Sequence, residues 1–171
     1  MKRIFIYSNR VAENPSEIID EVIRRIEAHG ILTVVVASAN GGSALKLAEA
    51  LSGKAKVIGV TEFTYDSKVK KNIIKLKGEV VEKADLPIQD RKEMRETLLS
   101  FGAGVKAALE VAVIAAERGL VSEEKIIAAS GGGGLVDTVL VVKPSTSKDM
   151  LSPDSTKRLK VLEFVVMPSI E

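Results

Sequence analysis

Residues 31–51 read ILTVVVASANGGSALKLAEAL. The run 31–37 is apolar and of strand length, whereas the apolar residues from Ala44 to Leu51 recur at helical spacing. The turn between them gathers backbone N–H groups and hydroxyls at the positive end of a helix dipole, where a phosphate or another small anion is favoured. Short turns also need Gly and Ser for geometry alone. The stretch predicts a strand–turn–helix unit of an α/β fold, with a candidate anion site.

A second glycine-rich turn follows another apolar strand, in KIIAASGGGGLVDT at residues 125–138. Four successive glycines cost conformational entropy, so they are expected where side chains are excluded, as by a flat ring or a phosphate close to the backbone. A plain hairpin connection or a bulge is the alternative. Asp137 and Thr138 offer an acceptor and a hydroxyl to a ligand, or they only open the next strand.

Strand and helix patterns alternate along the chain. We predict strands at 1–8, 31–37, 56–61 and 125–130, a short edge strand at 79–82, and a closing pair at 137–142 and 161–167. We predict helices at 15–29 and 44–51, a short helix capped by Ser67, and helical structure over 91–119 with a break near 102–104. This alternation favours right-handed crossovers and a mainly parallel sheet covered on both faces. The expected fold is a three-layer α/β/α sandwich with a mixed, mostly parallel sheet, formed by one domain over residues 1–171.

Four hydroxyl residues close predicted strands, namely Ser8, Ser38, Thr61 and Ser130. In parallel α/β sheets, ligands bind at the carboxyl ends of the strands, beside a reversal in strand order. We therefore expect all four residues to face one crevice, which would join the two glycine-rich turns into a single site.

Composition narrows the function classes. The net charge of +2 is small and only 4% of residues are aromatic, so nucleic-acid binding is not expected. The absence of cysteine removes disulfides and thiolate chemistry. No apolar run is long enough for a membrane span and the N-terminus is too short for a signal peptide, so a cytoplasmic location is expected. A cysteine-free chain rich in Lys and Glu also hints at a thermophilic source.

Few residues point to catalysis. Glu62 and Asp66 follow the third strand, but no base or nucleophile accompanies them. Glu110 shares a helix side with Lys106 and Glu117, which favours a solvated stripe over a buried functional acid. His29 precedes Gly30 at a helix end, where a structural role is favoured. Nothing forms a triad, a metal-spaced cluster or a carboxylate dyad, so the catalytic residues stay unknown and no metal site is predicted.

At these motifs the chain resembles the C-terminal α/β domain of pyruvate kinase, and more closely the stand-alone, mostly archaeal proteins built on that domain. The family's turn reads Thr-x-Ser-Gly-x-Ser-Ala after an apolar strand; here residues 38–44 read SANGGSA. Residues 57–61, VIGVT, resemble the family's next strand, which ends in Val-Thr. The family's last motif is Thr-Gly, a variable Gly-rich stretch and Gly-x-Thr-Asn-Thr; here Ser130-Gly131 is followed by GLVDT at 134–138. The match covers residues 31–61 and 105–143.

The resemblance implies a binding site for a small phosphorylated ligand, with flavin mononucleotide (FMN) as the expected cofactor. Phosphate would be held by the first turn, through Ser38, Asn40, Gly41, Gly42 and Ser43. The second turn would line the rest of the ligand, through Gly131, Gly132, Gly133, Gly134, Asp137 and Thr138. Thr61 and Glu62 join these candidates because they follow a strand that ends at the same crevice. Val136 and Asp137 replace the family's Thr-Asn pair, so a second phosphate is not expected.

Kinase activity is not expected, because the catalytic barrel of pyruvate kinase has no counterpart here. A flavin-dependent oxidoreductase stays open. The alternative function is a non-catalytic sensing module that binds a sugar phosphate, and a third is an oligomer-building scaffold with a vestigial pocket. The apolar runs at 139–142 and 162–166 would be sticky if they were exposed, so a homo-oligomer is expected under each hypothesis.

Overall fold

The computed structural model describes residues 5–7, 15–122, 124–131 and 135–168. Helices and strands alternate over residues 5–81, as predicted, and two helices and three strands follow. In chain order they are β1 (Phe5–Tyr7), α1 (Pro15–His29), β2 (Thr33–Ala37), α2 (Gly42–Ala50), β3 (Lys56–Val60), α3 (Ser67–Lys75), β4 (Glu79–Val81), α4 (Lys92–Leu99), α5 (Ala103–Glu117), β5 (Ile126–Ser130), β6 (Thr138–Lys143) and β7 (Lys160–Pro168).

The described strands form one sheet in the order β1-β7-β6-β5-β2-β3-β4. The pairs β1/β7, β5/β2, β2/β3 and β3/β4 are parallel, whereas β6 runs antiparallel to both β5 and β7. The sheet is therefore mixed and mostly parallel, which confirms the predicted fold class. The short edge strand expected at 79–82 is β4, at one border of the sheet.

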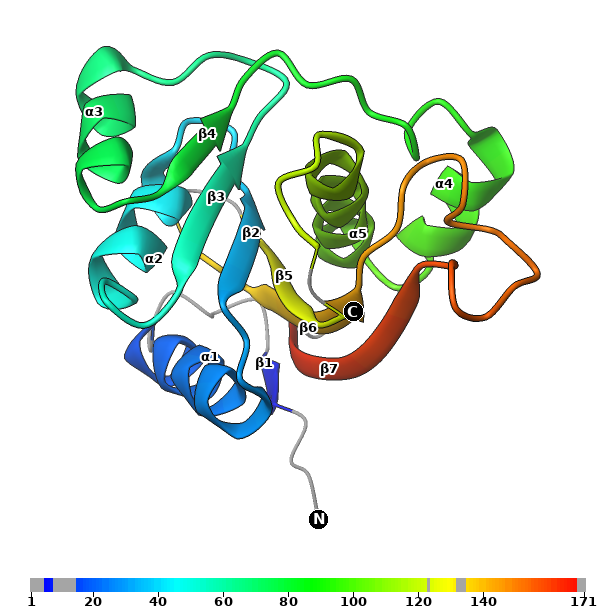
Figure 1. Cartoon of the computed structure of the whole chain (residues 1–171), viewed down its shortest axis with the longest axis horizontal. Coiled ribbons are helices and arrows are strands. Elements are labelled where there is room, and N and C mark those ends of the chain that lie inside the picture. The colour runs from blue at the N-terminus through cyan, green and yellow to red at the C-terminus, as the bar shows by residue number, and fades with distance from the viewer. Residues whose placement is uncertain (1–4, 8–14, 123, 132–134, 169–171) are drawn as a thin grey trace.

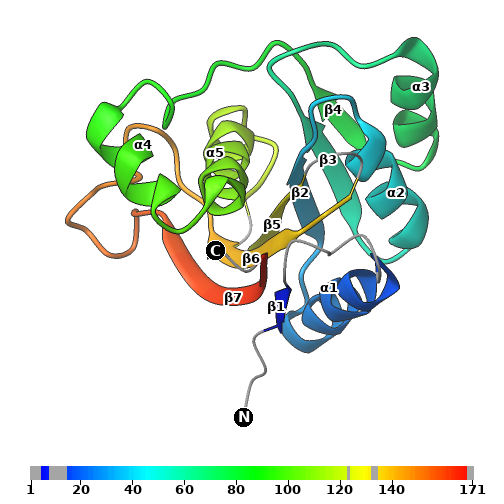
Figure 2. The same cartoon turned by 180° about the vertical axis from the view of Figure 1, so that it is seen from behind.

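Helices cover both faces of the sheet (Figures 1 and 2). Helices α1, α2 and α3 lie on one face, and α4 and α5 lie on the other. Successive side chains of β2 enter different cores: Val34 and Val36 pack with α1, α2 and α3, whereas Val35 packs with α5. Because both faces are buried, β2 reads as an unbroken apolar run instead of an alternating one.

The strand order reverses between β2 and β5. From β2 the chain proceeds through β3 to β4 at one border, while β5 leads through β6 and β7 toward the other. The carboxyl ends of β2 and β5 lie side by side, because Ala37 is registered with Ser130. In open α/β sheets, this arrangement creates a crevice at the carboxyl edge.

The structure corrects the predicted cap of α3 and shows the surroundings of His29. Ser67 is not the cap of α3: the helix begins at Ser67, and Asp66 caps it by accepting a hydrogen bond from the Lys68 N–H. A carboxylate one residue earlier satisfies the open N–H group, which leaves Ser67 inside the first turn. His29 ends α1 with its Nε2 3.7 Å from Glu163 Oε2, in keeping with a structural role.

The closing strand pair is confirmed, with β6 in the sheet interior and Leu162 of β7 44% exposed. Strand β6 lies between β5 and β7, and residues 139–142 are buried. Strand β7 is covered by β6 on one side and, at its carboxyl end, by β1 on the other. Along the described residues, no helix has the length and apolar character needed to span a membrane.

Candidate functional site

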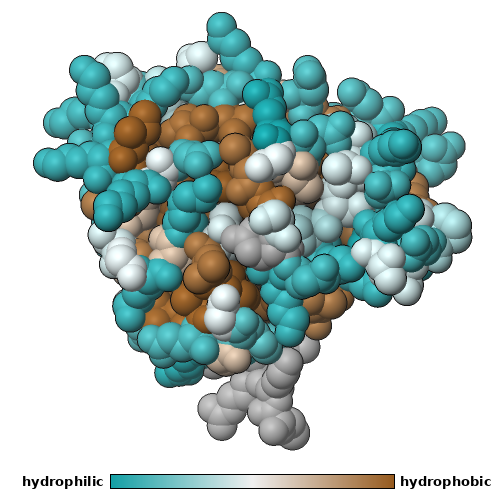
Figure 3. Space-filling model, viewed as in Figure 1, coloured by the Kyte–Doolittle hydropathy of each residue, from teal (hydrophilic) through white to brown (hydrophobic). Residues whose placement is uncertain are grey.

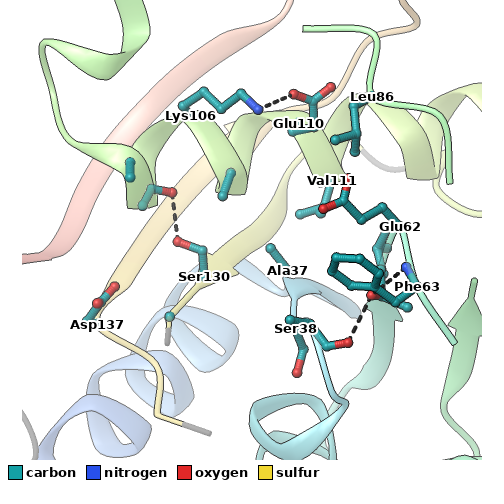
Figure 4. A pocket seen from close by; sticks show the side chains of 17 residues that line it. Ala37, Ser38, Glu62, Phe63, Leu86, Lys106, Glu110, Val111, Ser130 and Asp137 are labelled. Atoms are coloured by element: carbon teal, nitrogen blue, oxygen red, sulfur yellow. Dashed lines mark hydrogen bonds and ion pairs between the residues drawn. The ribbon is translucent and has the colours of Figure 1, made fainter. Parts of the chain in front are cut away.

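A cavity of about 380 Å³ lies at the carboxyl ends of β2, β3 and β5, on the face covered by α5. Figure 4 shows it between the α5 helix and the strand ends. Three of the four predicted strand-end hydroxyl residues, Ser38, Thr61 and Ser130, line it, and Ser8 lies outside the described residues. Its lining is Ala37, Ser38, Ala39, Val60, Thr61, Glu62, Phe63, Leu86, Ala103, Gly104, Lys106, Ala107, Glu110, Val111, Ser130, Gly131 and Asp137.

The strand-end hydroxyls hold the walls of the cavity together. Thr61 Oγ1 donates to the Ala39 carbonyl at 3.0 Å and accepts the Phe63 N–H at 3.1 Å, which ties the loop after β3 to the loop after β2. Ser130 Oγ donates to the Gly104 carbonyl at 2.7 Å and so fixes α5 to β5. These contacts define the crevice before any ligand enters.

Side chains of the turn before α2 accept hydrogen bonds from several of the turn's own N–H and hydroxyl groups. The Gly42 N–H donates to Asn40 Oδ1 at 2.9 Å, and the Ala44 N–H approaches Ser38 Oγ at 3.4 Å. Ser43 Oγ also donates to Ser38 Oγ, at 2.8 Å. Part of the anion-binding capacity predicted for this turn is thus engaged within the chain.

The same turn largely faces away from the cavity. Ser43 lines a separate hollow of about 30 Å³ with residues of α1 and with Leu135 and Val136. Asn40, Gly41 and Gly42 do not line the cavity either. Gly41 has a packing reason as well: its φ is +84°, and a Cβ there would lie 2.7 Å from Val69 Cγ1. Of the five residues predicted to hold phosphate, the structure brings Ser38 alone to the cavity wall, beside Ala39 of the same turn.

The second turn reaches the cavity through its two ends. Gly131 and Asp137 line it, while Gly132, Gly133 and Gly134 lie outside the described residues. A Cβ at Gly131 would overlap the Leu135 carbonyl, so the chain's own turn explains this glycine. Thr138 is fully buried and does not line the cavity; its hydroxyl donates to Asp137 Oδ1 at 2.9 Å.

Glu110 corrects the prediction of a solvated stripe. It is only 2% exposed, and its carboxylate accepts hydrogen bonds from the Ile88 N–H at 2.7 Å and the Gln89 N–H at 3.0 Å. Lys106 Nζ lies 3.0 Å from its Oε2. The loop before α4 brings backbone donors that need an acceptor, because buried N–H groups are rarely left unpaired. Glu110 thereby fixes the loop that carries Leu86 to the cavity.

The acidic groups of the site differ in environment. Glu62 is exposed at the cavity wall, whereas Asp66 caps α3 and does not line the cavity. Burial raises the pKa of the Asp137 carboxyl above its usual range, and the hydrogen bond from Thr138 opposes that shift. The cavity therefore combines an apolar interior with carboxylates from three different segments.

Sequence reasoning missed the wall formed by α5. This helix contributes Ala103, Gly104, Lys106, Ala107, Glu110 and Val111 to the lining. The helix break predicted at 102–104 coincides with the start of α5. The small residues at 103, 104 and 107 could have indicated that this end of the helix borders a cavity. Phe63 was also missed; it is 57% exposed at the rim. Figure 3 shows apolar surface near the top of this view, at the carboxyl end of the sheet.

No protein-family model matches the chain. Among the described residues, no group of three or more His, Asp or Glu side chains is placed to hold a metal ion.

Proposed function

We propose that the protein binds a phosphorylated small molecule with a flat ring, FMN, at the carboxyl edge of the sheet. The observation that carries this proposal is the cavity of about 380 Å³ at the reversal of strand order, lined largely by small and apolar residues. Ligand sites of α/β proteins occur at this position, and their volumes begin near about 300 Å³.

The lining suits a flat ring. Ala37 belongs to the sheet side of the cavity, and Ala103, Gly104 and Ala107 belong to the helix side. Small residues on both sides leave a space between two layers of secondary structure. Phe63 at the rim offers an aromatic face, which can stack on a conjugated ring. Asp137 and the backbone of Gly131 supply polar contacts at one end.

The proposal places the phosphate at the α2 turn, outside the cavity, because the start of a helix favours an anion. In this proposal the phosphate is held by Ser38, Asn40, Gly41, Gly42 and Ser43. The Gly42 N–H, which donates to Asn40 Oδ1 in the structure, would then donate to the phosphate instead. Gly131 and Asp137 line one end of the cavity, and Thr61 and Glu62, which follow β3, line the other side. When bound, FMN would supply redox chemistry, so an oxidoreductase is one outcome of the proposal.

Titration of FMN with the purified protein tests this function. We expect quenched or shifted flavin fluorescence, and about 2.7 kcal/mol of added stability at a free FMN concentration near 100 times Kd. Ala107→Leu should weaken binding because it fills the cavity, whereas Ala50→Leu, at a half-buried position of α2, should not. A protein that leaves flavin fluorescence and thermal stability unchanged would overturn the proposal.

A sugar phosphate is the alternative ligand of a non-catalytic sensing module. In a thermal-shift comparison, stabilisation by sugar phosphates but not by flavins would favour it. Self-association, a cytoplasmic location and a thermophilic source stay predictions from the sequence; sedimentation of the purified protein tests the first.

A further inference from the structure

Four charged side chains border the cavity, and they are unequal in sign. Glu62, Glu110 and Asp137 are acidic, and Lys106 is the one basic side chain in the described lining. Lys106 Nζ is committed to Glu110 at 3.0 Å, and both side chains are largely buried. The Glu110 carboxylate is further satisfied by two backbone N–H groups. This pair is internally neutral, so the charge that a ligand meets comes from the other two carboxylates.

Glu62 and Asp137 lie on opposite sides of the cavity, with Ala37 and Ser38 between them (Figure 4). Neither carboxylate forms an ion pair within the described part of the chain. The cavity is otherwise lined mostly by apolar atoms, which screen charge less than water does. An anionic group placed between these carboxylates would meet like charge from both sides.

The start of α5 is the feature that would favour an anion here, and Asp137 already occupies its neighbourhood. Gly104, in the first turn of α5, packs so closely on Thr138 that a Cβ would overlap Thr138 Oγ1. That same hydroxyl donates to Asp137 Oδ1 at 2.9 Å. The Asp137 carboxylate is therefore linked to the first turn of α5 through the Thr138 hydroxyl.

We propose that Glu62 and Asp137 make the cavity select ligand groups by charge: it accepts an uncharged or cationic group that offers N–H donors and rejects phosphate. This inference rests on the proposed function and deepens it, because it assigns the ring of FMN to the cavity and its phosphate to a place outside. Asp137 is the dominant determinant, since its carboxylate is partly buried whereas Glu62 is exposed to water, which screens its charge.

A competition experiment tests the proposal with lumiflavin, a flavin ring without ribityl chain or phosphate. Lumiflavin binding is followed by fluorescence while inorganic phosphate is added at constant ionic strength. We expect no competition in the wild-type protein. In Asp137→Asn, and more weakly in Glu62→Gln, phosphate should compete, with affinity raised at least about tenfold. Asp20→Asn and Glu49→Gln, at exposed positions of α1 and α2, should behave as wild type.

The outcomes separate the two proposals. Phosphate that competes equally in wild type and in Asp137→Asn would overturn charge selection and leave flavin binding intact. If lumiflavin and FMN both fail to bind the wild type, the proposed function is overturned. Calorimetric titration of phosphate then still tests charge selection: binding to Asp137→Asn in excess of binding to wild type supports it, and no difference between the two proteins refutes it. Circular dichroism of each variant checks that it is folded.

Discussion

Glu110 places a carboxylate inside α5, in the helix whose neighbouring residues are almost all apolar. The carboxylate is tolerated because three donors surround it: the N–H groups of Ile88 and Gln89 and the ammonium of Lys106. A buried charge with full pairing is stable in place, but loss of one partner leaves the others uncompensated. Glu110 thus acts on the site indirectly, by positioning the loop that holds Leu86.

Replacement of Glu110 should reveal this dependence. Glu110→Ala leaves the Lys106 ammonium and two N–H groups without their acceptor, and we expect it to lower the free energy of unfolding by about 3–5 kcal/mol. Glu110→Gln keeps one acceptor oxygen and should cost about 1–3 kcal/mol. Urea denaturation measures both losses. Glu49→Gln, on an exposed face of α2, serves as the control and should change stability by less than about 0.5 kcal/mol. An equally small effect of Glu110→Ala would contradict the role assigned to its carboxylate.

Asp137 should make stability depend on pH in a defined direction. Burial raises the pKa of its carboxyl above the ordinary value of 3.8, so the folded protein binds this proton more tightly than the unfolded chain. The stability that this proton contributes is complete below the pKa of Asp137 in the unfolded chain. It is lost as the pH rises through the raised pKa of Asp137 in the folded protein. Asp137→Asn should therefore be more stable than wild type at neutral pH, with the advantage shrinking in acid.

Urea denaturation of both proteins between about pH 3 and about pH 8 measures this difference. Asp20→Asn, at an exposed site, should show no such trend. If the stability advantage of Asp137→Asn over wild type grew as the pH fell, the predicted direction of the pH dependence would be wrong.

Among the elements, α5 depends most on close approach to the sheet. Gly104 brings its first turn onto β5 and β6: Ser130 Oγ donates to the Gly104 carbonyl at 2.7 Å, and Thr138 occupies the space that a side chain would need. Glycine is needed here for lack of space and not for its backbone conformation, since Gly104 has ordinary helical geometry. This close contact also sets the distance between α5 and the strand ends that form the cavity.

Gly104→Ala should displace the start of α5. The added methyl group must move either the helix or Thr138, and we expect a loss of about 1–3 kcal/mol in the free energy of unfolding together with weaker FMN binding. Lys71→Ala, at an exposed position of α3 away from the cavity, is the control. Unchanged stability of Gly104→Ala, measured by thermal and urea denaturation, would show that the helix has room to shift without cost.

At the scale of the molecule, one sheet separates two cores, each tied by a buried ionic contact. On the α1 side, Arg25 links Glu21 and Glu163, with N···O distances of 3.0 Å to each. On the α5 side, the corresponding contact joins Lys106 and Glu110. Because Val34 and Val36 of β2 pack on one core and Val35 packs on the other, we expect neither core to be lost while the sheet stays intact.

This architecture predicts a single cooperative unfolding transition. Arg25→Ala and Glu110→Gln lie on opposite faces and share no partner, so their effects on the free energy of unfolding should add within about 0.5 kcal/mol in the double variant. Circular dichroism and a dye that binds exposed apolar surface should report coincident urea transitions for all of these proteins. Separate transitions, or a large coupling energy, would contradict a single cooperative unit.

The candidate site was partly predictable. Ser38, Thr61, Glu62, Gly131 and Asp137 follow strands whose ends meet at one edge, and this follows from alternating strands and helices alone. The α5 wall did not follow, because the sequence does not state which helix closes over a given strand end. The burial of Glu110 was hidden for the same reason: its partners Ile88 and Gln89 lie 22 and 21 residues away along the chain.

The sequence by itself determined the order of strands and helices and hence the layered α/β architecture, because hydrophobic period, caps and turn residues are local properties of the chain. Only the tertiary structure decided the order of strands within the sheet, the burial of β6, the direction faced by the Ser38–Ser43 turn and the charges around the cavity. Those features arise where distant segments compete for the same space and the same hydrogen-bond partners, and no local pattern records that competition.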